Sequence, residues 1–257
     1  MRRNLRMLGV AWLLNVKQLT RSSFDGILAI LWPLFFATVA FFMFRAGGDP
    51  KALVYASLGA AVMGIWTATS VSAGSALQRE RWHGTLELLV AAPAHFSLVL
   101  LPLAFATSAI GVYCMATTLL FGRFVFGIDL TLVHPLFMAA AIPATILSIG
   151  ALGFLMAVSF ARYRSSWALG SMTEYPIWLI CGFLVPLALL PAWVHPISWA
   201  LAPTWGMRAI RESSTGGTPL PDIGMCVLLG GLYVAIGIFV TEGVLRAARR
   251  SASLSLT

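Results

Sequence analysis

The sequence predicts an all-α integral membrane protein with one domain, residues 1–257, and its composition is the first reason. Hydrophobic residues make up 59% of the chain and charged residues only 10%, and the mean hydropathy is +0.88. A soluble domain is about half apolar and about a quarter charged. The second reason is that most of the charges fall between long apolar stretches, as expected for helices that cross a bilayer.

Six apolar stretches reach the length of ~20 residues that a spanning helix needs. They cover residues 26–44, 53–77, 97–121, 136–160, 167–190 and 223–245. We therefore expect a six-span bundle over residues 26–245, with a cytoplasmic tail at 246–257. The first stretch has no small-residue cleavage site at its end, so we interpret it as a retained span rather than a signal peptide.

Residues 1–25 precede the bundle and show apolar residues at helical spacing. These are Leu5, Leu8, Trp12, Val16 and Leu19. The pattern predicts an amphipathic helix that lies in the membrane interface, although Val10 and Leu14 fall on the polar side. A helix partly buried against protein fits the same pattern.

The positions of lysine and arginine predict the orientation, because positive charge is retained on the cytoplasmic side. With six spans both termini share one face, and that face carries all of the 17 basic residues except Arg45, Lys51, Arg123, Arg208 and Arg211. The termini should therefore be cytoplasmic. The net charge of +8 then reflects topology and attraction to anionic lipid, and we expect no nucleic-acid partner.

Two polar features lie inside the predicted spans. The second span carries Gly59, Met63, Thr67, Ser70 and Gly74 at helical spacing, which favours close helix packing, or else a polar wall of a substrate path through Thr67 and Ser70. The fifth carries Glu174 near the bilayer centre, where a carboxylate is costly and usually functional or paired. Glu174 either lines a cavity and contacts substrate, or is a structural group hydrogen-bonded to another span. Pro33 should kink the first span.

A segment rich in proline and tryptophan follows the fifth span. Pro186, Pro191, Pro196 and Pro203 exclude one continuous helix, and the intervening tryptophans keep the segment amphipathic. It should form two short helices, a broken hairpin that re-enters the outer leaflet. We expect residues 213–218 to link it to the last span, with Pro221 and Asp222 at the start of that helix.

The sequence lacks the common signatures of catalytic and metal sites. The phosphate-binding loop GxxxxGK[ST] needs a lysine preceded by glycines, and neither Lys17 nor Lys51 has them. Cys114, Cys181 and Cys226 lie within predicted spans without metal-site spacing, which predicts buried apolar packing, no disulfide and no metal. We therefore predict neither an enzyme nor a cofactor in this chain.

One short segment between the second and third spans is unusually charged. Its sequence is QRERWHGTLELLVAAP, residues 78–93, with Arg79, Glu80 and Arg81 at the membrane edge. Gly84 suits the start of a short helix, and Pro93 would end it. The Glu87 carboxylate would lie in the first turn, where the positive end of the helix dipole stabilises a negative charge. Taken alone, the segment is an amphipathic loop.

This segment resembles the E-x-x-x-GTLE-x-L-x-x-x-P element of ABC-2 type transporter permeases, the membrane subunits of a class of ATP-binding-cassette exporters. The residues that match are Glu80, Gly84, Thr85, Leu86, Glu87, Leu89 and Pro93. The predicted order of helices along the whole chain is also similar to that of these permeases. The resemblance implies that the segment is a coupling helix that docks on a cytoplasmic ATPase through Arg79, Glu80, Arg81, Gly84, Thr85, Leu86, Glu87 and Pro93.

The same resemblance implies the partners and the activity. Two ATPase subunits would bind ATP and Mg, and a second permease, identical or related, would complete the path in a bacterial inner membrane. The cargo would be an amphipathic or lipid-like molecule such as a drug, lipid or glycolipid. Two alternatives are an ion-gradient-driven secondary transporter, which should show inverted repeats and several intramembrane carboxylates, and a membrane-embedded enzyme, which should show convergent catalytic residues.

Overall fold

The computed structural model describes residues 9–17, 31, 34–39, 41–43, 50–82, 97–128, 133–160 and 166–251. In these residues all the regular structure is helical, which confirms the predicted fold class. The long helices are α3 (Pro50–Trp82), α5 (Ser97–Phe126), α6 (Pro135–Phe160), α7 (Ser166–Ile180) and α10 (Pro219–Ser251). Pro33 and the kink predicted there lie outside the described residues.

Four stretches of the described helices are long and apolar enough to cross a bilayer. They are Leu53–Ser70, Leu100–Phe126, Pro135–Phe160 and Pro219–Gly243, and they match the second, third, fourth and sixth predicted spans. The first predicted span is described only in part, as the shorter apolar helix Leu34–Met43. The fifth corresponds to α7, which has only 15 residues, so the count of six remains a prediction.

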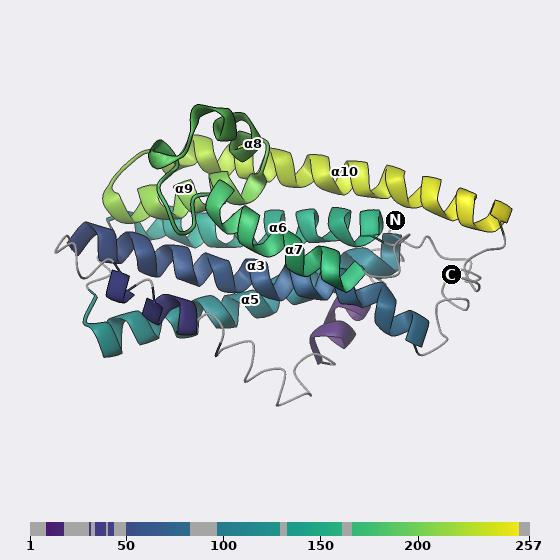
Figure 1. Cartoon of the computed structure of the whole chain (residues 1–257), viewed down its shortest axis with the longest axis horizontal. Helices are drawn as coiled ribbons and strands as arrows, with labels where there is room; N and C mark the ends of the chain where they lie inside the picture. Colours follow the sequence, from purple (N-terminus) through teal and green to yellow (C-terminus); the bar gives the residue numbers. More distant parts are fainter. Residues whose placement is uncertain are drawn as a thin grey trace.

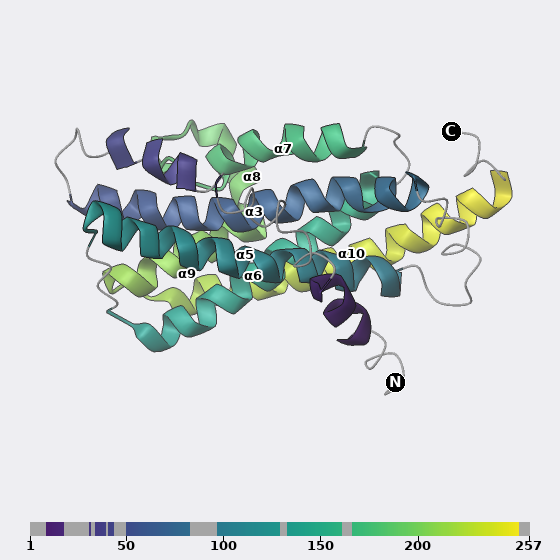
Figure 2. The ribbon, with the colours of Figure 1, turned by 90° about the horizontal axis from the view of Figure 1, so that it is seen from below.

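The long helices lie side by side, and successive helices run in opposite directions (Figures 1 and 2). α6 contacts α3, α5, α9 and α10, whereas α7 packs mainly on α3. Burial of the candidate spans follows this arrangement. In α3 and in α6, 72% of the span is buried inside the protein, but in α10 only 22% is buried. α3 and α6 therefore form the centre, and α10 presents most of its apolar surface outward.

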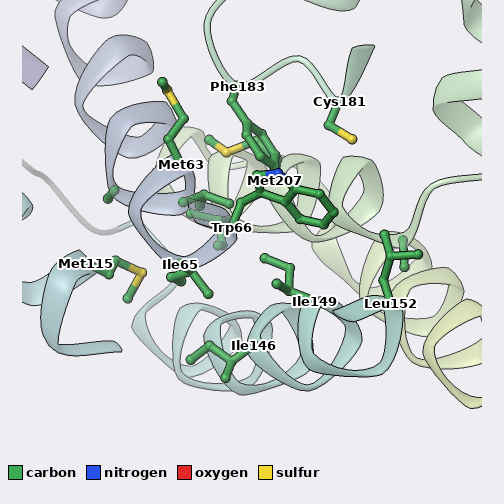
Figure 3. Close-up of a cluster of buried hydrophobic side chains, with 14 of the residues drawn as sticks. Met63, Ile65, Trp66, Met115, Ile146, Ile149, Leu152, Cys181, Phe183 and Met207 are labelled. Carbon is green, nitrogen blue, oxygen red and sulfur yellow. The ribbon is translucent and has the colours of Figure 1, made fainter. Parts of the chain in front are cut away.

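Figure 3 shows the centre of the bundle, where side chains from α3, α6 and α9 and from the turn after α7 meet. Trp66 of α3 is fully buried, as are Phe183 of the turn and Met207 of α9. Ile146, Ile149 and Leu152 of α6 line the opposite side (Figure 3). The core thus joins the spanning helices to the short helices that follow α7. The three cysteines are buried, which confirms their predicted burial.

Small residues let the helices approach closely, as expected for packing within lipid. A side chain placed on Gly59 of α3 would lie 1.9 Å from the carbonyl oxygen of Phe183. One on Gly206 of α9 would lie 2.5 Å from the Thr145 hydroxyl of α6. The packing role predicted for the stripe that begins at Gly59 is therefore confirmed at its first residue.

The fifth predicted span, 167–190, is wrong at its end, because α7 stops at Ile180. Gly182 adopts the left-handed conformation with φ 73°. The Gly182 N–H donates to the Leu179 carbonyl and the Phe183 N–H donates to the Trp178 carbonyl, which is the hydrogen-bond pattern of a Schellman motif. Glycine reaches this conformation without steric cost, so the chain reverses ten residues earlier than the apolar stretch indicates.

Residues 183–218 form no continuous helix, as the four prolines predicted, but they form four short helical elements instead of the two expected. The re-entry into the outer leaflet stays a prediction. The four elements are the 3-10 turns η1 (Leu187–Leu189) and η2 (Ala192–Val194) and the helices α8 (His195–Trp199) and α9 (Ala202–Thr215). Each proline stands immediately before or in the first turn of one of them, where its missing N–H is harmless. α8 and α9 lie toward the end of the bundle where α10 begins (Figure 1).

Two boundaries in this region differ from the prediction. The first half of the expected link, residues 213–218, is helix, because α9 continues to Thr215 and is capped by Gly216 with φ 90°. α10 begins at Pro219 rather than at Pro221. Ser213 and Ser214 are buried on α9, because that helix packs between α6 and α10.

The predicted amphipathic helix before the bundle is described over residues 9–17, which are helical. Trp12, Leu13 and Leu14 are exposed there, and Figure 2 shows this stretch set apart from the long helices. Exposed apolar residues on a separate helix agree with a position in the membrane interface. The interfacial position itself stays a prediction.

Candidate functional site

Glu174 and Thr67, two residues predicted for a substrate path, are joined directly. The Thr67 hydroxyl of α3 donates a hydrogen bond of 2.5 Å to Oε1 of Glu174 on α7. Glu174 is 9% exposed. Of the two roles open from the sequence, this contact supplies the hydrogen bond to another span, and contact with substrate stays a prediction.

Ser70, the third residue predicted for the path, lies one turn further along α3. It is fully buried, and its hydroxyl donates to the Thr67 carbonyl at 3.4 Å. Ser70 therefore bonds within its own helix instead of to Glu174. The three predicted residues lie together, and Glu174 supplies the only charge among them.

Aromatic side chains accompany Glu174 on α7. Trp178 stands four residues after Glu174, so both lie on the same side of the helix. The Trp178 ring meets the Phe36 ring edge-on at 4.8 Å between centroids and the Tyr175 ring at 5.1 Å. Trp178 is buried, and its indole N–H has no acceptor among the described residues. Sequence reasoning did not connect these rings with Glu174, although the i, i+4 spacing was available.

Arg211 of α9 forms a second polar centre, which we call the Arg211 cluster, made of Arg211, Tyr55, Gly182 and Phe183. The guanidinium donates to the Gly182 carbonyl at 2.7 Å and to the Phe183 carbonyl at 3.1 Å. Its central carbon lies 3.2 Å from the centroid of the Tyr55 ring, and the Tyr55 hydroxyl donates to Gly182 at 2.9 Å. The cluster holds α9, the turn after α7 and the start of α3 together.

From the sequence, Arg211 was predicted only as one of the charges that set the topology, so this role was missed. No sequence pattern distinguishes it from Arg208, three residues earlier. The Arg208 side chain is 41% exposed, and its guanidinium lies 3.4 Å from the Asp222 carboxylate of α10 and 3.8 Å from that of Glu212. Only the packing of α9 shows that Arg211 points into the protein and Arg208 toward the junction with α10.

The predicted coupling residues are only partly described. Arg79, Glu80 and Arg81 belong to the last turn of α3, which continues without a break to Trp82. Gly84, Thr85, Leu86, Glu87 and Pro93 lie outside the described residues. α3 therefore connects the charged end of the segment with Thr67 and, further along, with Tyr55 in the Arg211 cluster.

Comparison with known proteins adds one finding. The family model described as ABC-2 type transporter matches residues 8–214, which include the charged segment, Thr67, Glu174 and Arg211. No curated protein matches the chain. The match covers well over half of the sequence and agrees with the helical membrane architecture, and on these grounds the chain belongs to the ABC-2 type transporter family.

Proposed function

We propose that this chain is the permease subunit of an ATP-driven exporter, which forms a transport path with a second permease and obtains energy from separate cytoplasmic ATPase subunits. The observation that carries the proposal is the family match over residues 8–214. ABC-2 permeases are membrane transport components that associate with ABC ATPases. The stoichiometry of two permeases and two ATPases, the outward direction of transport and the bacterial inner membrane are parts of the proposal.

The geometry of α3 supports a coupling mechanism. The helix has 33 residues and is therefore about 50 Å long at 1.5 Å per residue. Its last turn carries Arg79, Glu80 and Arg81, and Tyr55 near its first turn contacts the Arg211 cluster. If the segment after α3 docks on an ATPase, closure of the ATPase would move α3 as a rigid body and shift contacts at its far end.

The substrate path in this proposal lies between α3 and α7, where Thr67, Ser70 and Glu174 meet. These are the only two described helices that supply polar residues predicted for the path. The apolar outer surface of the bundle suits an amphipathic or lipid-like cargo that enters from the membrane. The second permease could be another copy of this chain, which gives a homodimer, or a related chain, which gives a pair of half-transporters.

A secondary transporter is the second candidate, favoured by one observation. Glu174 is a buried intramembrane carboxylate, the kind of group that binds protons or ions in gradient-driven carriers. The two candidates differ in their energy source. Export that persists when ATP is depleted and stops when the ion gradients are collapsed would favour the carrier.

The first experiment identifies the partners. The chain is purified with a mild detergent from its source membranes, the subunits are identified by mass spectrometry, and the complex is imaged. We expect an ABC ATPase to copurify in equal numbers with the permease. Absence of any ATPase from a preparation that still exports its cargo would contradict the proposal.

The second experiment tests the coupling segment with Gly84→Val and Glu87→Ala. Valine is β-branched and would strain or obstruct a tight turn at Gly84. Alanine removes a carboxylate worth about 0.3–1 kcal/mol at a helix start, and more across a desolvated interface. We expect less ATPase association or ATP hydrolysis without export, at normal permease abundance and with substrate binding retained. Normal export by both variants would show that the segment is only a connecting loop.

A further inference from the structure

We propose that the α3–α7 interface around Glu174 binds the cationic group of the transported molecule, so that the cargo is a lipophilic cation. This inference rests on the proposed function as a transporter and adds the charge of the cargo. It begins from the carboxylate itself. One oxygen of Glu174 accepts the Thr67 hydroxyl, and a carboxylate can accept several further hydrogen bonds.

Glu174 has no cationic partner among the described residues. Arg208, on α9, pairs with Glu212 and Asp222 instead. Neither α7 nor the stretch Leu53–Ser70 of α3 contains a lysine, arginine or histidine. A buried carboxylate without a counter-ion is costly in a membrane, and a bound cation would remove that cost.

Arg211 of α9 contacts Tyr55 of α3 and is already engaged. Tyr55, which it contacts, is twelve residues from Thr67, about 18 Å along the helix axis. Its guanidinium donates to two backbone carbonyls of the turn after α7. Arg211 is therefore engaged away from Glu174, which leaves the carboxylate without a cation among the described residues.

The aromatic residues beside Glu174 favour a cation that carries apolar groups. The negative faces of aromatic rings attract organic cations, and Trp is the strongest of the three aromatic residues in this respect. Trp178 lies one helical turn from Glu174 and is flanked by Phe36 and Tyr175. A carboxylate next to such rings matches a quaternary or aromatic cation better than a strongly hydrated metal ion.

Two further features of α7 agree with this ligand class. Pro176 lies inside the helix and has no N–H for the carbonyl of Met172, so that oxygen is left as an additional acceptor. The outward face of α7 is apolar, with Met172 72%, Tyr175 60% and Leu179 45% exposed. The apolar part of a ligand could therefore stay in contact with lipid while the cationic group of the same ligand reaches Glu174.

The test compares two probes of similar size and opposite charge. The purified full chain is placed in phosphatidylcholine nanodiscs, and binding of tetraphenylphosphonium and of tetraphenylborate is measured by equilibrium dialysis against empty nanodiscs. We expect saturable binding of the phosphonium and at least tenfold weaker binding of the borate. Equal binding of both probes by the unmodified chain would overturn the proposal, and this comparison does not depend on any variant folding.

Glu174→Gln then locates the site. Glutamine keeps the size and an oxygen that can accept from Thr67, but it removes the charge. We expect the phosphonium to bind at least tenfold more weakly. The matched control is Glu212→Gln, which removes a carboxylate on α9 and should bind like the unmodified chain. Unchanged phosphonium binding by Glu174→Gln would also overturn the proposal.

The outcome separates this inference from the proposed function. If an ATPase copurifies and the phosphonium does not bind, the exporter assignment stands and the cationic cargo is wrong. If the phosphonium binds at Glu174 and its transport follows an ion gradient without an ATPase, the cargo class stands and the exporter assignment is wrong.

Discussion

Gly59 shows how one residue determines the distance between two parts of the molecule. A β-carbon there would lie 1.9 Å from the Phe183 oxygen and 3.0 Å from the Phe183 carbonyl carbon. These are backbone atoms, which cannot move aside like the end of a flexible side chain. The close approach of α3 to the turn after α7 therefore depends on glycine having no side chain at position 59.

Gly59→Ala should lower stability for this reason. Overpacking typically costs about 1–3 kcal/mol, and we expect a lower Tm in detergent than for the unmodified chain. Gly231→Ala is the matched control, because a β-carbon at Gly231 of α10 meets nothing within 4 Å. The measurement is thermal unfolding of both variants side by side. Equal Tm values would mean that the turn moves aside without cost.

At the scale of elements, the Arg211 cluster links three of them through a charge. The guanidinium supplies donors to the carbonyls of Gly182 and Phe183, which the reversal of the chain removes from regular helix bonding. A buried carbonyl that loses its donor costs about 1–3 kcal/mol. The position of α9 against the turn thus depends on hydrogen bonds as well as on apolar contacts.

Arg211→Met should loosen the segment after α7. Methionine fills a similar volume but donates no hydrogen bond, so residues 181–201 should exchange their amide hydrogens faster, while α6 stays protected. Hydrogen exchange measured by mass spectrometry checks this expectation. Arg123→Met, at an exposed position of α5, serves as the control. Unchanged exchange across residues 181–201 would show that apolar packing alone holds the segment.

At the scale of the whole molecule, burial indicates how the bundle meets its surroundings. α10 buries 22% of its candidate span, against 72% for α6, and most of its large exposed side chains are apolar, among them Leu228 and Phe239. In a membrane this surface is in contact with lipid or with another subunit. α3 and α6, by contrast, are enclosed by other helices of the same chain.

The orientation of the molecule can be tested by cysteine labelling. Thr218, between α9 and α10, is exposed, and the charge distribution predicts that it faces outward. Thr218→Cys should react with an impermeant maleimide in intact cells, and Ser251→Cys only after permeabilisation. Cys114, Cys181 and Cys226 are buried, so their background should be low. The reverse labelling pattern would show that the orientation is wrong.

The fold class and four of the spans could be predicted from the sequence, because a bilayer admits long apolar segments only as helices or closed barrels and the length needed is fixed by its thickness. The broken region after α7 was also predictable, since proline restricts its own backbone. The resemblance of residues 78–93 likewise pointed to the family that the match over 8–214 shows.

Tertiary structure alone decided where α7 ends, which arginine of α9 points into the protein, and what Glu174 contacts. The apolar run continues past Gly182, so hydropathy gives no stop, and it is the left-handed glycine with its two hydrogen bonds that reverses the chain. Arg208 and Arg211 look alike in sequence, and only the packing of α9 against α3 and α6 separates them. Glu174 and Thr67 are 107 residues apart along the chain, and a contact between distant residues depends on how the helices pack, which no local pattern records.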